Sequence, residues 1–238
     1  MWSSDGAGAM RAGSSRVWIT RAKPAADATA MRVRARGLEP LVAPLLIVHP
    51  IEGVALDLDG VGALAFTSAN AIPAFAALTS ERSLPVFAVG EATAAAARTA
   101  GFAHVVAADG DVSALAHRVA ADGDLGLVLH PGALEPAGDL AAALTAAGIE
   151  ARNLPVYRTE AAGVLPPAVG ADPPGAVLLH SPKAARALAA LIPPHWPPAM
   201  EALALSPACA APLVGRGFRR LEAARLPNEA ALLALLEP

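Results

Sequence analysis

The sequence predicts an α/β fold in which two parallel-sheet domains are joined by a two-stranded β-ladder and related by a pseudo-twofold internal repeat. Short apolar runs alternate with alanine-rich segments, which is typical of parallel sheets covered by helices on both faces. An apolar run ending in Thr67-Ser68-Ala69-Asn70 leads directly into a helix-forming segment, and Ser181-Pro182-Lys183 repeats that arrangement. Two equivalent junctions favour a duplicated fold.

Composition limits the class of protein. With 238 residues, 55% of them apolar, the chain can form one large or two small globular domains. The net charge of -3 and the absence of Lys/Arg runs argue against nucleic-acid binding, which needs a basic surface. The single cysteine, Cys209, rules out an internal disulfide and thiolate metal sites and fits a reducing cytoplasm.

The amino-terminal residues 1–15 are rich in Ser, Gly and Ala and are expected to form a flexible tail. They lack the apolar core of a signal peptide. No apolar stretch approaches the roughly 20 residues that a membrane helix requires. We therefore expect a soluble, cytoplasmic protein that does not contact a membrane.

The first half of the chain divides into β–α units. Pro24 and Gly37 stand where a helix begins and ends, and Pro44 and Pro50 restrict the next apolar run to an edge or ribbon strand. In order, we expect a strand at 16–21, a helix from about 23 to 36, a proline-broken strand at 41–50, a strand at 63–66, a helix near 72–78, a strand at 85–89, a helix at 92–99 and a strand at 104–107.

The second half follows the same pattern, and Asn228 is expected to cap its last helix. In order, we expect a helix near 112–121, a strand at 125–129 ending in His130-Pro131-Gly132, a helix from about 138 to 147, a proline-broken strand within 151–159, a connector at 164–175, a strand at 176–179, a helix at 184–192, a strand at 202–205, a helix at 208–214, a strand at 218–223 and a helix at 229–236.

The two halves match in order: residues 17–37 correspond to 127–148, and each is followed by a proline-broken strand and two strand–helix junctions. Alanine-rich α/β proteins resemble one another in general, but the matched order argues against chance. If the proline-broken strands pair, the first β–α unit lies with the last third of the chain, as in a swapped element. We expect a tail at 1–15, a first domain at 16–40 plus 159–238, a linker at 41–50 and 151–158, and a second domain at 51–150.

Each junction brings a helix amino end, with free backbone N–H groups and a positive dipole, to a strand's carboxyl end, which suits an anionic ligand. For Ser68, Asn70, Thr93 and Ser181 the alternative is helix capping. Arg21 and Lys183 are candidates for pairing with ligand carboxylates, and for them the alternative is a solvated surface charge. His130 and His180 both follow strands and are candidates to contact a ligand. For each, the alternative is an ordinary polar residue at a strand end. No Ser-His-Asp arrangement, phosphate loop or metal-spaced histidine cluster occurs.

Five motifs follow one another along the chain: Thr20-Arg21 after the first strand, Thr67-Ser68-Ala69-Asn70, Val89-Gly90-Glu91-Ala92-Thr93-Ala94, Pro155-Val156-Tyr157-Arg158-Thr159 and Ser181-Pro182. Taken together, these ordered motifs resemble the uroporphyrinogen-III synthase family. Each motif is short, so the order carries the resemblance, which covers about Arg16 to Leu236.

The resemblance implies cyclisation of linear hydroxymethylbilane to uroporphyrinogen III, with loss of water, inversion of the last pyrrole ring and no cofactor. It implies an active site in a cleft between the domains, with substrate carboxylates held largely by backbone amides. The expected partners are this tetrapyrrole and, transiently, the preceding enzyme of the pathway; the chain is expected to be a monomer. Positioning of the substrate is the main catalytic task.

Tyr157 matches the family tyrosine proposed to assist departure of the hydroxyl, since a neutral phenol can donate to the leaving oxygen. Its alternative is a packed connector aromatic. The residues expected to bind substrate are Thr20, Arg21, Thr67, Ser68, Ala69, Asn70, Gly90, Thr93, His130, Gly132, Ser181, Lys183, Ser206 and Cys209; none is expected to bind a metal.

Three positions depart from the family pattern. His130-Pro131-Gly132 replaces the usual Arg-Gly-Glu or Arg-Gly-Asp, Ser206 replaces Gly, and Cys209 replaces Thr. These departures leave open a non-catalytic tetrapyrrole- or anion-binding relative. A second alternative, a periplasmic-type two-domain binding protein, is disfavoured because no signal peptide is found.

Overall fold

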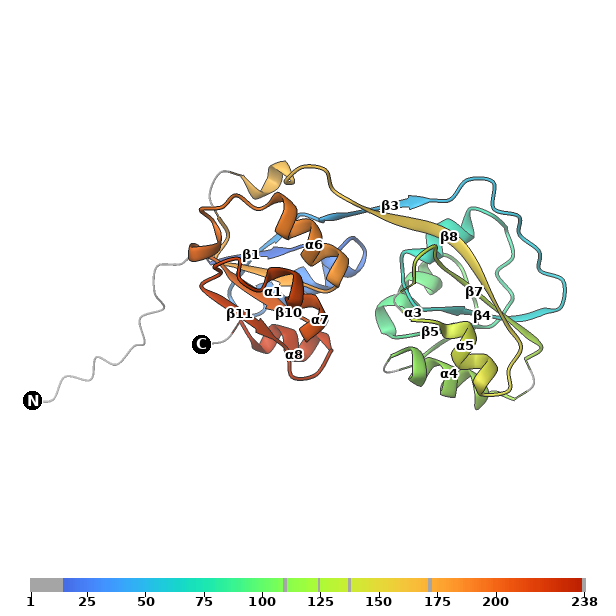
Figure 1. Ribbon diagram of the computed structural model, residues 1–238. Coiled ribbons are helices and arrows are strands. Elements are labelled where there is room, and N and C mark those ends of the chain that lie inside the picture. Colours follow the sequence, from blue (N-terminus) through green and yellow to red (C-terminus); the bar gives the residue numbers. More distant parts are fainter. Residues whose placement is uncertain (1–14, 109–110, 124, 137, 171–172, 237–238) are drawn as a thin grey trace, which may run out of the picture. The chain divides into compact units, whose positions relative to one another are not determined.

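The computed structural model describes residues 15–108, 111–123, 125–136, 138–170 and 173–236 (Figure 1). These residues divide into two compact units. Unit 1 contains the described residues up to Ala22, those of Ala26–Leu46 and those from Ala161 onward; unit 2 contains Lys23–Ala25 and those of Ile47–Glu160. Apart from Ser15, the tail expected at 1–15 lies outside the described residues.

Unit 1 is built on a parallel five-stranded sheet with the order β11-β10-β9-β1-β2. All its strands are short and mostly apolar, as expected for strands that helices cover on both faces. Because the strands are parallel, their carboxyl ends share one edge of the sheet. The strands are β1 (Arg16–Ile19), β2 (Glu39–Val42), β9 (Ala176–Leu179), β10 (Glu201–Ala204) and β11 (Arg220–Ala223).

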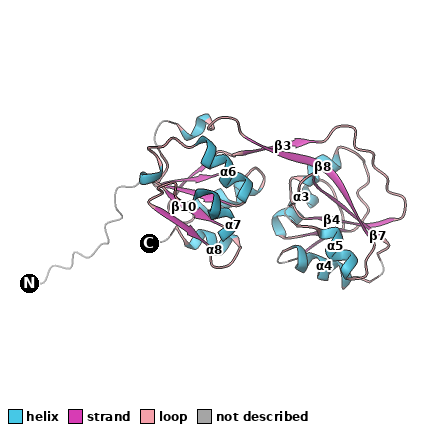
Figure 2. Cartoon of the chain, in the orientation of Figure 1, coloured by secondary structure: helices cyan, strands magenta, loops and turns pink. Residues whose placement is uncertain are grey.

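Helices cover both faces of this sheet (Figure 2). Helices α1 (Ala25–Arg34) and α8 (Glu229–Ala234) contribute to the hydrophobic cluster on one face. Ala26, Ala30 and Val33 of α1 are buried at helical spacing, which turns one side of the helix to the sheet. Helices α6 (Pro182–Leu191) and α7 (Pro207–Ala210) and the 3₁₀ turns Pro167–Val169 and Ala211–Leu213 contribute to the other cluster, as do Trp196 and Met200, which flank the 3₁₀ turn Pro197–Ala199.

Unit 2 is built on a six-stranded sheet with the order β3-β8-β7-β4-β5-β6. The pairs from β8 to β6 are parallel. Strand β3 runs antiparallel to β8, since Ile51 N donates to Val156 O and Ala162 N donates to Leu45 O, each at 2.9 Å. The strands are β3 (Leu46–Pro50), β4 (Val61–Phe66), β5 (Val86–Ala88), β6 (Val105–Ala107), β7 (Leu127–Ala133) and β8 (Ala151–Ala161).

The faces of the second sheet are also covered by helices. Helices α2 (Ala71–Ala76) and α3 (Glu91–Thr99) cover the face that carries the aromatic cluster of Phe66, Phe75 and Phe102, whose ring centroids lie 5.8–6.4 Å apart. Helices α4 (Val112–Ala120) and α5 (Leu140–Ala146) cover the opposite face. The chain therefore has the mixed α/β fold, dominated by parallel sheets, that the sequence predicts.

Two expected elements differ from the structure. The run at 41–50 is not one strand: Ala43 N and Leu45 N still bond to Ile19 O and Thr20 O beside β1, and only then does β3 pair with β8. Residues 130–132 continue β7 instead of ending it. A proline is tolerated there because β4 pairs with β7 only as far as Leu129, so that side of β7 has no ladder at Pro131.

The two sheets share an order of connections. Strand β1 lies between β9 and β2 in unit 1, and β7 lies between β4 and β8 in unit 2. Whether a twofold axis relates the units, and whether the expected domain bounds hold, stay predictions. Within the described residues, no helix is both long enough and apolar enough to cross a membrane.

Candidate functional site

The predicted site residues gather at the carboxyl edges of the two sheets. Thr20 and Arg21 follow β1, His180 and Ser181 follow β9, and Ser206 lies just beyond β10. In unit 2, Thr67 follows β4, and Gly90 lies just beyond β5. Carboxyl edges of parallel sheets are common ligand sites because helix amino ends and loop side chains converge there.

In unit 1 the edge is organised by Glu229, the first residue of α8, which the sequence predictions did not single out. Arg21 Nη1 lies 3.1 Å from Glu229 Oε2, Thr29 Oγ1 donates to Oε1 at 2.5 Å, and His180 Nε2 lies 3.1 Å from Oε2. Arg32 Nη1 lies 3.8 Å from Oε1. We call Arg21, Thr29, His180 and Glu229 the Glu229 cluster; it brings together Arg21, which is expected to bind substrate, and His180, which is a candidate to contact a ligand.

The cluster has a defined charge state. Burial alone would raise the pKa of Glu229, but it is lowered to about 2 by the hydrogen bond from His180 and the charge that this ring carries once it is protonated in acid, and then by the hydrogen bond from Thr29 and the charge of Arg21. Burial lowers the pKa of His180, against the opposing effect of Glu229, so the ring is neutral at pH 7. A neutral His180 donates from Nε2 to the carboxylate, and its buried Nδ1 has no hydrogen-bond partner among the described residues.

In unit 2 the edge is organised by His130, a residue that is 2% exposed. Its Nδ1 lies 2.8 Å from Asn153 Oδ1 and its Nε2 lies 3.1 Å from Thr67 Oγ1. Asn153 Nδ2 donates to Asp139 Oδ1 at 3.5 Å, and this same oxygen caps α5 by accepting from Ala142 N at 3.0 Å. We call Thr67, His130, Asn153 and Asp139 the His130 network.

His130 is buried inside β7 and not placed at a strand end, which corrects the sequence prediction. Burial lowers its pKa, although the hydrogen bond with Asn153 and the charge of Asp139 act in the opposite direction. Gly132, two residues further along β7, makes room for the ring: a Cβ at that position would lie 3.0 Å from His130 Nε2. The absence of a side chain at Gly132 therefore leaves the space that the His130 ring occupies.

The start of α2 has no side-chain cap. Asn70 has helical backbone angles and makes no side-chain cap bond; instead Ser68 Oγ accepts from Asn70 N at 3.2 Å. Ala69 is buried, and among the described residues its N–H has no hydrogen-bond acceptor. Asn70 therefore holds the cap position without a side-chain cap bond, and Ser68 makes only a local turn bond, so the capping alternative is wrong for both side chains.

At the starts of α3, α6 and α7, the cap residues have extended backbones. Ser181 Oγ accepts from Ala184 N at 3.1 Å, so Ser181 is the cap of α6. Ser206 Oγ instead donates to the buried Cys209 Sγ at 3.3 Å. Gly90 caps α3 through its carbonyl, and Thr93 is buried inside that helix, so capping is wrong for Thr93.

Thr20 and Lys183 differ in how free they are to meet a ligand. The Thr20 side chain is fully buried and its hydroxyl donates to Leu178 O at 2.7 Å, so this hydroxyl's proton is used within the sheet. Lys183 is half-buried in the first turn of α6 and takes part in an interaction of its own. Neither residue belongs to the Glu229 cluster as defined.

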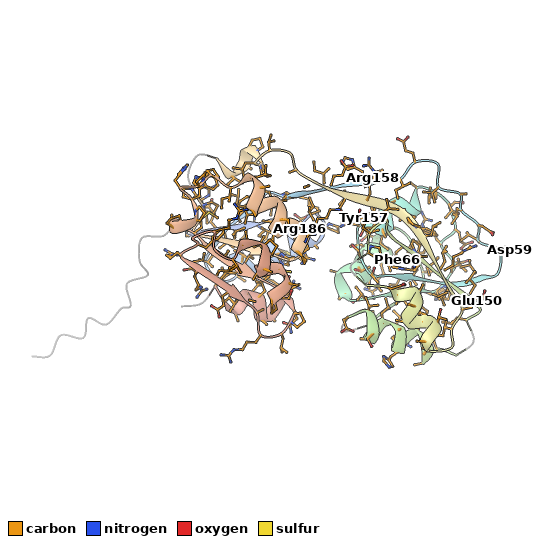
Figure 3. All side chains as sticks on the ribbon, in the orientation of Figure 1. Asp59, Phe66, Glu150, Tyr157, Arg158 and Arg186 are labelled. Atoms are coloured by element: carbon orange, nitrogen blue, oxygen red, sulfur yellow. The ribbon has the colours of Figure 1, made fainter. Side chains whose placement is uncertain are left out.

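Tyr157 lies on β8, beside Ala133 of β7, and its ring belongs to the hydrophobic cluster of Phe66 (Figure 3). The residue is 6% exposed. Among the described residues, the only buried side-chain N or O atoms without a partner are His180 Nδ1 and Arg220 Nε. The Tyr157 hydroxyl, which has no bonded partner there, is thus open to solvent. The Tyr157 ring is packed, as the alternative to a catalytic role requires, yet its hydroxyl can contact a ligand.

Sequence reasoning missed Glu229, Asn153 and Asp139. A first-turn carboxylate beside the Asn228 cap was the signal for Glu229. No sequence signal pointed to Asn153, because its role depends on the strand register that places it opposite His130. Within the described ranges, no group of three or more His, Cys, Asp or Glu side chains could hold a metal ion.

Two sheets dominated by parallel strands, with polar side chains at their carboxyl edges, place the chain in the α/β class, in which ligand sites commonly lie at strand–helix junctions. The comparison of sequences with protein families narrows the class. The profile described as uroporphyrinogen-III synthase HemD matches residues 27–234. The chain therefore belongs to the uroporphyrinogen-III synthase family.

A solved structure gives the same fold. The chain is similar to uroporphyrinogen-III synthetase from Helicobacter pylori, with a TM-score of 0.60 and 20% identity over 94% of this chain and 98% of that one. A mutant uroporphyrinogen III synthase from Thermus thermophilus matches with a TM-score of 0.47 and 16% identity over 93% and 97% of the two chains. The comparison with curated proteins found no match. These comparisons do not favour a non-catalytic relative.

Proposed function

We propose that this chain is a uroporphyrinogen-III synthase: a cyclising lyase that converts hydroxymethylbilane to uroporphyrinogen III with loss of water and inversion of the last pyrrole ring. The observation that carries the proposal is the family match across residues 27–234. We further propose a cytoplasmic location and a monomer. The expected position of the site between two domains stays a prediction.

The chemistry of the two sheet edges suits this reaction. The substrate is a polyanion, and the start of α2 offers a backbone N–H, at Ala69, without an internal acceptor. Arg21 is bound to Glu229, so its charge is largely balanced before any ligand arrives. Backbone amides are therefore the stronger candidates for holding substrate carboxylates at the start of α2, while the Glu229 cluster holds the edge of unit 1 in shape.

Tyr157 is the proposed catalytic residue. Its ring is fixed by packing, and its hydroxyl is open to solvent and free of an internal partner among the described residues. A phenol held in this way can donate a hydrogen bond to the departing hydroxyl of the substrate and remain neutral at pH 7. The protein's further task is to hold the chain of pyrroles so that ring closure follows inversion.

The experiment is an isomer assay. Hydroxymethylbilane is supplied to the purified chain, and the cyclic products are separated after oxidation. We expect the III isomer in excess of the I isomer that forms spontaneously. Formation of the I isomer alone, at the rate seen without protein, overturns the proposed function.

A further inference from the structure

The His130 network has one consistent arrangement of its hydrogens. Asp139 is a carboxylate and can only accept, so Asn153 turns its NH₂ group toward it and its Oδ1 toward His130. The reverse orientation would set two acceptor oxygens 3.5 Å apart. His130 Nδ1 therefore carries the ring proton and donates it to Asn153. Because burial keeps the ring neutral, Nε2 is an acceptor.

This arrangement decides what Thr67 can do. A threonine hydroxyl has one proton and two lone pairs. Thr67 Oγ1 lies 3.1 Å from His130 Nε2, so it donates its proton there. Because this proton is already donated to His130, the hydroxyl can only accept a hydrogen bond from any further group. Thr67 is half-buried at the carboxyl edge of the sheet, beside the start of α2, so a ligand at this edge meets an acceptor oxygen.

We propose that His130 is a positioning residue which, held by Asn153, makes the Thr67 hydroxyl an acceptor for an N–H donor of the ligand, namely a pyrrole N–H of the linear tetrapyrrole. A ligand carboxylate is excluded from this hydroxyl, because two acceptors would face each other without a proton. The ligand's identity rests on the proposed function. The direction of the Thr67–His130 hydrogen bond is a property of the free protein and does not rest on the proposed function.

The Ala69 N–H and the Thr67 hydroxyl therefore bind ligand groups of opposite hydrogen-bonding polarity. The N–H of Ala69 is a donor without an internal acceptor among the described residues and suits a carboxylate, whereas the Thr67 hydroxyl suits a donor. Two sites of opposite polarity, two residues apart, can fix which part of a tetrapyrrole chain lies where, since side-chain carboxylates and ring N–H groups alternate along it. Unsatisfied polar groups penalise the wrong register of the ligand.

The first test uses the protein without ligand. Long-range ¹H–¹⁵N NMR of histidine-labelled protein at pH 7, with the His130 signals assigned by loss in His130→Gln, is expected to show a neutral ring protonated on Nδ1. Asn153 is exposed, so Asn153→Leu should fold, and it should move the proton to Nε2. A ring in wild type that is protonated on Nε2, or doubly protonated, overturns the proposal.

The second test uses hydroxymethylbilane with the active chain. Thr67→Val keeps the shape of the side chain but removes the acceptor, and we expect its KM to rise about 10-fold, with a smaller change in kcat. Thr67→Ser keeps the hydroxyl and should recover most of that loss. An unchanged KM in a folded Thr67→Val variant overturns the inference. If wild type forms only the I isomer, the proposed function and the ligand assignment fail, whereas the NMR result still decides the polarity of Thr67.

Discussion

Glu229 links side chains that are far apart in the sequence. It accepts from Thr29 and His180 and pairs with Arg21, and all these partners lie in unit 1. The carboxylate is only 20% exposed, so its partners must replace the water that it loses on folding. The low pKa of Glu229, about 2, shows that they do so with a net gain.

Glu229→Gln should lower the free energy of unfolding of unit 1 by about 3 kcal/mol at pH 7. The folded pKa of about 2 lies below the ordinary value of 4.5, so this stabilisation is present above about pH 5 and is lost as the pH falls toward 2. At pH 3 the difference between wild type and variant should shrink to about 1 kcal/mol. Urea titrations followed by tryptophan fluorescence measure it.

Fluorescence is suited to this measurement because Trp18 and Trp196 are buried in unit 1, and unit 2 contains no tryptophan. Glu222→Gln is the matched control within unit 1, since Glu222 is exposed in its pair with Arg220 and should contribute less than about 1 kcal/mol. A Glu229→Gln effect that is equally large at pH 3 and pH 7 would contradict the charged state assigned to Glu229.

Gly132→Ala should destabilise unit 2 by about 1–2 kcal/mol, because its Cβ would press on a His130 ring that is held by hydrogen bonds at both nitrogens. Urea denaturation followed by circular dichroism measures the change. Gly163→Ala, whose Cβ meets no heavy atom within 4 Å, is the control and should be neutral or slightly stabilising. In a His130→Ala background, the cost of Gly132→Ala should largely vanish; a cost that persists there would remove His130 as its cause.

Tyr157→Phe should lower kcat for III-isomer formation several-fold or more, because the proposed donor to the leaving hydroxyl is removed. Stability should change by less than about 0.5 kcal/mol, since the hydroxyl is open to solvent and the ring is retained. The isomer assay and a thermal melt provide both values. A folded variant with unchanged kcat ends the catalytic role of Tyr157.

At the scale of elements, the order of strands and helices was predictable because each depends on local pattern. Apolar runs became β4 and β9, and Pro24, Gly37 and Asn228 stand at helix ends. Elements that depend on distant partners were not predictable. The run at 41–50 divides between two sheets, and residues 130–132 continue β7 because β8 provides a partner there.

The start of α2 gives the sharpest prediction at this scale. Ser68→Ala removes one local hydrogen bond, from Asn70 N, and should cost less than about 1 kcal/mol of stability, with little effect on KM. Ala69→Pro removes the N–H that has no internal acceptor among the described residues and should raise KM considerably more. Steady-state kinetics, with circular dichroism to verify folding, compare the two. The reverse order would mean that the side chain, and not the backbone, binds substrate.

At the scale of the whole molecule, the sequence supported the family and the fold more strongly than the contacts of the site. Arg21 and Glu229 are separated by 208 residues and Thr67 and His130 by 63, so the clusters that they form depend on strand order and register. No local pattern carries such pairings. Thr20, Arg21, Thr67 and His130 were selected because they follow or end strands, yet their partners emerged only from the folded chain.

The most direct test of the account is the amount of uroporphyrinogen III formed per chain. With hydroxymethylbilane in large excess, a synthase turns over repeatedly, whereas a non-catalytic binding relative could at most redirect one substrate at a time. We expect many moles of III isomer per mole of chain, with the III isomer dominant over the I isomer. A yield of III isomer that does not exceed one per chain, or the I isomer alone, would contradict the assignment.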